Sequence, residues 1–456
     1  MNPASSGGAR PETATAGGFR RELGLWDTTV IVAGAIIGVG IFVNPSNVAR
    51  ILPAPEWMLL VWLAGGALAM IGGFVYAELG SRLPVVGGQY VYLARSWGPF
   101  AGFLYGFALL FVINTGGMAA VASALAGYVD SSFWHLGSAA KLALAAGVIV
   151  VLTEINVRGV RPGKRTNNGL MALKLGGIAA IALLVLVKRP PSATTYHLPT
   201  TASVTLTAFF AALVPVLFAY GGWQNCGSLA AEIRDAGKTL AKANILGVAL
   251  VVTVYVGLNW IYLWVLSPAD IAGSTALAAD VARALAGDLG ARFVSALTVV
   301  SCLGFLAVIT MTGPRLYYAM ARDGLFLRRA ATLHPRFGTP SFTLRLQAAV
   351  ALVLLFSQTY DQLLSYVVFC DWLFFGLTAA GLFQLRRQAT GSGLSGDAPF
   401  RAPGHPWTTA IFVALSCGVV VNSFIAAPKQ ALAGCAVLAV GAAGYFLSQR
   451  RTPTRA

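Results

Sequence analysis

The sequence predicts an all-α membrane protein with twelve transmembrane helices. Of the 456 residues, 57% are hydrophobic and only 11% are charged, whereas a soluble domain carries about 25% charged residues. Apolar stretches of about 20 residues, long enough to cross roughly 30 Å of hydrocarbon, recur along the chain. Because lipid offers backbone groups no hydrogen-bond partner, each stretch is expected to be helical.

The predicted spans follow one another at short intervals. They cover residues 26–51, 57–81, 99–127, 138–157, 168–188, 204–232, 242–266, 289–320, 342–357, 360–384, 408–427 and 429–448. Residues 1–22 are rich in Gly, Ala, Ser and Thr and have no apolar signal-peptide core. We therefore expect a disordered cytoplasmic tail there and a second cytoplasmic tail at residues 449–456.

The basic residues behind the net charge of +16 are distributed in a way that predicts the membrane topology. If the N-terminus is inside, 24 of the 32 basic residues fall on inside segments, seven fall outside, and Lys174 lies within a span. Because basic residues gather on the cytoplasmic side of membrane proteins, both termini are predicted to be cytoplasmic. The expected location is the inner (plasma) membrane, in contact with lipid, and no nucleic-acid partner is expected.

Two spans are interrupted by glycine at corresponding places. The first contains GAIIGVGIF at 34–42, and the sixth contains FAYGGW at 218–223. A glycine costs about 1 kcal/mol in a helix interior, so such runs weaken a helix. One run alone is equally consistent with close packing of small residues. Two breaks five spans apart indicate inverted repeats with a substrate site near the membrane midplane.

A broken helix suits a zwitterionic ligand. The start of a half-helix presents free N–H groups and the positive end of the helix dipole, which attract a carboxylate. The end of a half-helix presents free carbonyl oxygens, which attract an ammonium. No charged side chain is then required in the site.

Several motifs carry a resemblance to a known family. They are GAIIGVGIFVNP at 34–45, AELGSRLPVVGGQYVYL at 77–93, FAYGGWQNCGSLAAEI at 218–233, RLYYAMARDGLF at 315–326 and HPRFGTP at 334–340. On these motifs the chain resembles the amino acid–polyamine–organocation (APC) superfamily, in particular its L-type amino acid transporters and their bacterial relatives.

The resemblance implies a leucine-transporter-like fold that works by alternating access. Two inverted repeats of five helices would occupy residues 23–188 and 203–385, with helices 1 and 6 unwound in mid-membrane. Helices 11 and 12, at residues 407–448, would lie outside the repeats.

The resemblance also assigns binding residues at the two breaks. It places the substrate carboxylate on the backbone N–H groups of Gly38, Val39 and Gly40. It places the substrate ammonium on the carbonyl oxygens of Ile36, Phe218, Ala219 and Gly221. Phe218 resembles the family's aromatic gate. Val39 stands where many L-type relatives have Ser, so the backbone alone would hold the carboxylate.

Lys174 is the one basic residue inside a predicted span. A lysine there costs a few kcal/mol unless it is paired or reaches water, and snorkelling to the cytoplasmic end is one explanation. The family often has a lysine in span 5 where sodium-coupled relatives bind a cation. The ammonium would then replace the ion and tie helix 5 to the break in helix 1, or carry a proton.

Further candidates for substrate or gate contacts are polar or aromatic residues within the spans. They are Asn114, Trp223, Gln224, Ser301, Cys302 and Asp371. For Trp223, packing is the favoured interpretation. For Asp371, the cavity lining, a substrate contact and a pairing with another helix stay open.

The resemblance implies a sodium-independent secondary transporter, an exchanger or facilitator, for small neutral L-amino acids. A proton-coupled symporter, a cationic amino acid or polyamine antiporter, and a non-transporting amino acid sensor are the alternatives. The four histidines lie in predicted loops without metal-ligand spacing, so no enzyme activity, metal or cofactor is expected. Residues 128–137, the loop after the third span, contain no Cys, so no disulfide-linked heavy chain is expected.

Overall fold

The computed structural model describes residues 21–188, 204–357, 360–391 and 398–451, and within them the fold is helical. The α-helices are α1 Leu25–Ile36, α2 Gly40–Ile51, α3 Pro55–Arg82, α4 Gln89–Trp97, α5 Pro99–Ala108, α6 Asn114–Ser132, α7 Ser138–Val157, α8 Val160–Lys188, α9 Leu206–Tyr220, α10 Ala236–Val265, α11 Pro268–Gly273, α12 Leu277–Arg322, α13 Ser341–Ser357, α14 Tyr360–Gly391, α15 Trp407–Ala426 and α16 Pro428–Arg451. A π-helical turn, η1 (Leu109–Ile113), and two 3₁₀ helices, η2 (Trp223–Glu232) and η3 (Arg328–Ala331), complete the set.

Eleven helical segments of the described chain are long and apolar enough to cross a membrane. The predicted span at 342–357 corresponds to a shorter apolar helix, Ser341–Phe356. Of the predicted tails at 1–22 and 449–456, residues 1–20 and 452–456 lie outside the described residues, whereas residues 449–451 continue helix α16. Glu22, which the sequence assigns to the tail, donates its backbone N–H to the carbonyl oxygen of Glu232 at 3.0 Å.

Two spans differ in detail from the expectation. The third extends to Ser132 and contains the π-helical turn η1 between α5 and α6. The eighth is preceded by a further helical stretch, because α12 begins at Leu277 and bends at Gly287, whose φ of 66° favours glycine. Neither feature has a hydropathy signal, since both leave the apolar stretch itself intact.

The predicted breaks in the first and sixth spans are confirmed. The chain leaves the helix after Ile36 and re-enters it at Gly40, and the sixth span stops at Tyr220 before η2 begins at Trp223. Gly222 has a φ of 127°, which glycine alone adopts readily. A Cβ atom on Gly222 would lie 2.4 Å from the carbonyl oxygen of Ala35, so the two breaks are in direct contact.

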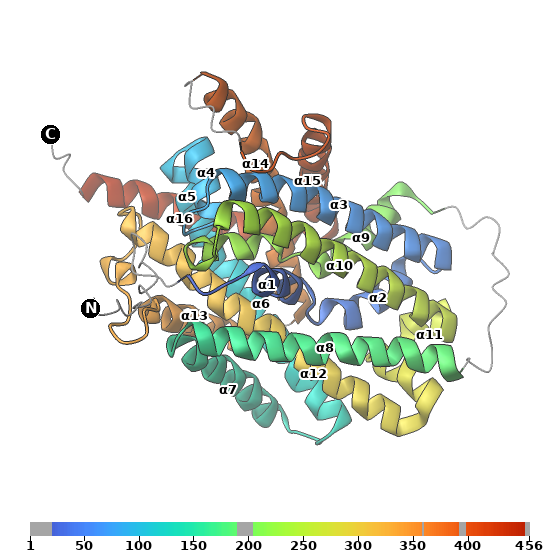
Figure 1. The fold of residues 1–456 in the computed structure, drawn as a ribbon. Coiled ribbons are helices and arrows are strands. Elements are labelled where there is room, and N and C mark those ends of the chain that lie inside the picture. The colour runs from blue at the N-terminus through green and yellow to red at the C-terminus, as the bar shows by residue number, and fades with distance from the viewer. Residues whose placement is uncertain (1–20, 189–203, 358–359, 392–397, 452–456) are drawn as a thin grey trace, which may run out of the picture.

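The broken helices lie at the centre of the bundle. In α1 every residue from Thr28 to Ile36 is buried. α1 packs against α10 and α12, α2 packs against α9, and α3 runs beside α10 (Figure 1). The helices α7, α15 and α16 expose most of their surface and lie at the periphery. The fold therefore surrounds the two breaks with unbroken helices.

Candidate functional site

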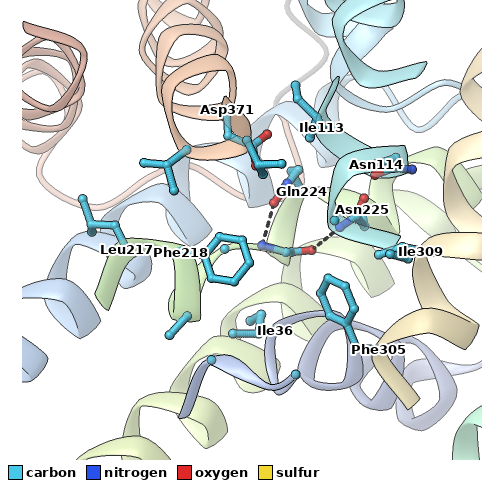
Figure 2. Close-up of a pocket in the computed structure, with 18 of the residues that line it drawn as sticks. Ile36, Ile113, Asn114, Leu217, Phe218, Gln224, Asn225, Phe305, Ile309 and Asp371 are labelled. Carbon is cyan, nitrogen blue, oxygen red and sulfur yellow. Dashed lines mark hydrogen bonds between the residues drawn. The ribbon is translucent and has the colours of Figure 1, made fainter. Parts of the chain in front are cut away.

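A cavity of about 60 Å³ lies between the two breaks. Seven predicted residues line it: Ile36, Gly38, Val39 and Gly40 from the first break, and Phe218, Ala219 and Gly221 from the second. Three further candidates, Asn114, Gln224 and Asp371, also line it (Figure 2). The structure thus brings together residues from the two broken spans, the third span and α14.

The start of α2 faces this cavity without a cap. Val39 is the N-cap residue and makes no side-chain capping bond, and Gly40 opens the helix. Both residues line the cavity, so the first N–H groups of α2 and the positive end of its dipole are available there. Gly40 allows a close approach of the two broken spans, since a Cβ atom on it would lie 2.9 Å from Cα and Cβ of Ala219.

Three of the four predicted carbonyl acceptors already have a protein partner. The hydroxyl of Tyr255, in α10, lies 3.0 Å from the carbonyl oxygen of Ile36 and 3.1 Å from that of Ala219. The carbonyl oxygen of Phe218 accepts a bond from the N–H of Gly221 at 3.2 Å. Because Tyr255 contacts both broken spans, it fixes their relative position. The sequence analysis did not identify Tyr255, because no local pattern distinguishes it among the 14 tyrosines.

The side chains of Gln224 and Asn225 form hydrogen bonds with the backbone of the second break. Gly222 donates its N–H to Oε1 of Gln224 at 3.0 Å, and Nδ2 of Asn225 donates to the carbonyl oxygen of Gly222 at 3.1 Å (Figure 2). Both side chains also line a second, smaller cavity of about 10 Å³, which Ser228 borders. They therefore separate the two cavities. Asn225 was missed, although an adjacent pair of amides within an apolar span was a usable signal.

Lys174 and Ser301 lie behind the first break rather than in the cavity. The Lys174 ammonium, fully buried, donates a hydrogen bond to the carbonyl oxygen of Ile37. The Ser301 hydroxyl donates to the carbonyl oxygen of Gly38 at 3.1 Å. α8 and α12 thus each anchor one peptide of the break. Cys302 is also buried and does not line the cavity.

Aromatic rings close part of the cavity. The ring of Phe305 packs on Gly38, with ring carbons 3.2–3.3 Å from the position of a Cβ atom there. Phe218, the predicted gate, lines the same cavity (Figure 2). Trp223 is buried, does not line the cavity, and packs against Phe375 with ring centroids 5.1 Å apart. Phe305 was missed, because one phenylalanine among 25 has no distinguishing local pattern.

Comparison with known proteins identifies the family. A family model described as amino acid permease matches residues 23–446. The serine/threonine exchanger SteT of Bacillus subtilis (strain 168) is 30% identical over 417 residues, which cover 90% of this chain and 92% of the relative. The b(0,+)-type amino acid transporter 1 of Oryctolagus cuniculus is 30% identical over 81% of this chain and 76% of its own length.

A human relative extends the similarity over nearly the whole chain. Large neutral amino acids transporter small subunit 2 of Homo sapiens is 29% identical over 96% of this chain and 83% of its own length. The family match, these relatives and the apolar helices agree with one another. The chain is therefore a multi-pass membrane protein that transports amino acids, is not an enzyme, and belongs to the amino acid permease family.

Proposed function

We propose that the protein is a sodium-independent exchanger or facilitator of small neutral L-amino acids, working by alternating access. The observation that carries the proposal is the cavity between the two breaks, where the uncapped start of α2 meets the end of α9. A carboxylate binds the N–H groups of Val39 and Gly40, because free N–H groups and the helix dipole both favour an anion. The ammonium binds carbonyl oxygens of the second break, beginning with Gly221.

The size of the cavity supports a small substrate. Its volume of about 60 Å³ is far below the roughly 300–1,000 Å³ of pockets that hold drug-sized ligands. Phe305 and Phe218 occupy the space that a large side chain needs, since both line the cavity. Small amino acids therefore fit this conformation better than aromatic ones.

Lys174 supports independence from sodium. Its ammonium donates a hydrogen bond to the Ile37 carbonyl oxygen, which is the kind of backbone acceptor that a coupling cation uses in broken-helix transporters. A bound sodium ion at the same carbonyl would be repelled by the ammonium. Lys174 thus ties α8 to the first break without a coupling ion.

The proposal also includes the repeat architecture and the membrane topology. Helices α1 to α8 form the first repeat, α9 to α14 form the second, and α15 and α16 lie outside them, with all twelve predicted spans crossing the membrane. Both termini lie in the cytoplasm and the protein resides in the inner membrane, where the 24 basic residues of the inside segments face the anionic leaflet. The protein works without a disulfide-linked heavy chain.

Transport by the purified protein in liposomes tests the proposal. Vesicles are loaded with one amino acid or left empty, and labelled alanine, serine, leucine and phenylalanine are offered outside, with and without sodium and pH gradients. We expect uptake of the small amino acids that rises with internal amino acid and does not change with sodium. Uptake driven only by an acidic exterior would replace the exchanger with a proton-coupled symporter, and uptake of none of the four would refute the proposal.

A further inference from the structure

The carboxyl group of Asp371, in α14, borders the cavity without a partner of its own. Its Oδ1 atom is shielded from solvent and makes no hydrogen bond to any described residue. The residue lines the cavity together with both breaks, and Figure 2 shows it among the lining side chains. Its neighbours in α14, Cys370 and Trp372, are buried.

The two fully buried acids of the described bundle, Glu78 and Glu232, both have ion-pair partners, whereas Asp371 is partly buried. Glu78 binds Arg386 at 2.6 Å and Arg82 at 2.8 Å. Glu232 binds Arg315 at 3.0 Å, with both side chains only 1% exposed. A carboxyl group taken out of water needs such partners, because the loss of its hydrogen bonds to water is otherwise uncompensated. Asp371 is the exception, and it is the one that faces the cavity.

No basic group of the protein fills this gap within the described residues. The titratable groups that interact electrostatically with Asp371 are Tyr76 on α3, Tyr105 on α5 and Cys370 on its own helix. Tyrosine and cysteine are neutral here and provide no counter-charge. A ligand in the cavity can supply the missing donor.

We propose that Asp371 binds the side chain of the substrate and selects amino acids that carry a hydrogen-bond donor close to the α-carbon, as the hydroxyl of serine does. This inference rests on the proposed function. The backbone groups of the two breaks hold the α-carboxylate and α-ammonium that all amino acids share, so they cannot discriminate among side chains. The rest of the lining is largely apolar, as at Ile113, Phe218 and Phe305, and Asp371 is the acidic group in it.

This chemistry predicts that substrates with a side-chain donor are preferred over apolar substrates of the same size. A side chain with a donor replaces the hydrogen bond that the Asp371 carboxyl lost on burial. An apolar side chain of the same size leaves that carboxyl unpaired. A hydrogen bond to a charged group changes affinity by about tenfold or more. The cost of leaving the Asp371 carboxyl unpaired further increases the difference in affinity between substrates with and without a donor.

The test uses three substrates that differ only in one group on the β-carbon. L-2-aminobutyrate carries a methyl group, L-serine a hydroxyl, and L-2,3-diaminopropionate an amine, which is protonated when the assay is run below neutral pH. Exchange is measured in proteoliposomes for the wild type, for Asp371→Asn, and for Asp288→Asn as the matched control. The Asp288 side chain is 88% exposed in its ion pair with Arg283. Asp288 does not line the cavity.

We expect the wild type and Asp288→Asn to prefer one or both donor substrates over 2-aminobutyrate by about tenfold or more in kcat/KM. In Asp371→Asn the preference for the protonated amine should fall by about tenfold, while exchange of 2-aminobutyrate persists. Whichever donor substrate shows the preference identifies the substrate group that Asp371 binds.

Three results would overturn the inference. The wild type shows no preference among the three substrates, or Asp371→Asn keeps the wild-type preference, or Asp371→Asn loses exchange of all three alike. In each of these cases the proposed function stands, because the wild type still exchanges amino acids. Failure of the proposed function is a separate result, in which the wild type moves none of them.

Discussion

The ammonium of Lys174 in α8 donates a hydrogen bond to the backbone carbonyl oxygen of Ile37, inside the break between α1 and α2. One residue further along, the carbonyl oxygen of Gly38 accepts a bond from the hydroxyl of Ser301 in α12 at 3.1 Å. The first break is thus held from two sides by side chains that do not themselves line the cavity. This arrangement makes the two anchors separable by mutation.

Replacing Lys174 should reduce transport more than replacing Ser301. Lys174→Met keeps most of the length of the side chain but removes the ammonium that pairs with the Ile37 carbonyl, so exchange should fall by about tenfold or more, as expected for a lost hydrogen bond to a charged group. Ser301→Ala removes one neutral hydrogen bond, for which a loss of about fivefold is expected. Initial rates of exchange in proteoliposomes provide the measurement, and equal rates for the two variants would contradict the anchoring role of Lys174.

Tyr255 should contribute to both stability and substrate affinity. Its hydroxyl lies within hydrogen-bond distance of the carbonyl oxygens of Ile36 and Ala219, so Tyr255→Phe leaves buried acceptors without this partner. We expect a loss of about 1–3 kcal/mol in the free energy of unfolding and a higher KM for the amino acid. Thermal unfolding in detergent and exchange kinetics measure the two effects.

Tyr262 provides the matched control on the same helix. Its hydroxyl is buried and has no hydrogen-bond partner among the described residues. Tyr262→Phe therefore removes a polar group whose burial was uncompensated, and stability should stay the same or rise. If Tyr262→Phe were as destabilising as Tyr255→Phe, the effect at Tyr255 would reflect the loss of any tyrosine hydroxyl on α10 rather than the link between the two breaks.

The buried ion pair between Arg315 and Glu232 should be the most sensitive charge pair in the described chain. Both side chains are 1% exposed, so Glu232→Gln leaves an uncompensated guanidinium in the interior, at a cost of about 3–5 kcal/mol. The pair of Arg345 and Glu154 has the same 3.0 Å separation, but its side chains are 60% and 41% exposed. Glu154→Gln should therefore cost less than about 1 kcal/mol. The free energy of unfolding of both variants, measured in detergent, tests this prediction. Similar losses of stability in the two variants would show that burial does not determine the strength of these ion pairs.

The sequence was sufficient to predict the positions of the spans and of the two breaks, because both depend on local composition. Apolar length specifies a span, and a run of glycines weakens a helix wherever it lies. The individual binding residues at the two breaks were assigned by the family resemblance, and all seven of them line the cavity. The contact of Lys174 with the first break was expected on the resemblance alone, since the local sequence also allowed snorkelling.

The rest of the cavity depends on how each helix is rotated about its axis, which local composition does not specify. Trp223, Ser301 and Cys302 were candidates for the lining, but packing turns them away from it, while Phe305 on the same helix as Ser301 faces it. The π-helical turn Leu109–Ile113 shifts the register of the third span immediately before Asn114. Its sequence, LLFVI, resembles any apolar helix, so the shift had no visible signal.

The central claim is that the contact between the two breaks forms the amino acid site, and the exchange activity of Gly40→Ala tests it most directly. A Cβ atom on Gly40 would lie 2.9 Å from Cα of Ala219, whereas a Cβ atom on Gly418, in α15, meets nothing within 4 Å. Gly40→Ala should force the two broken spans apart and reduce exchange of labelled serine by at least about tenfold, with Gly418→Ala close to the wild type. Wild-type exchange by correctly folded Gly40→Ala would contradict the account.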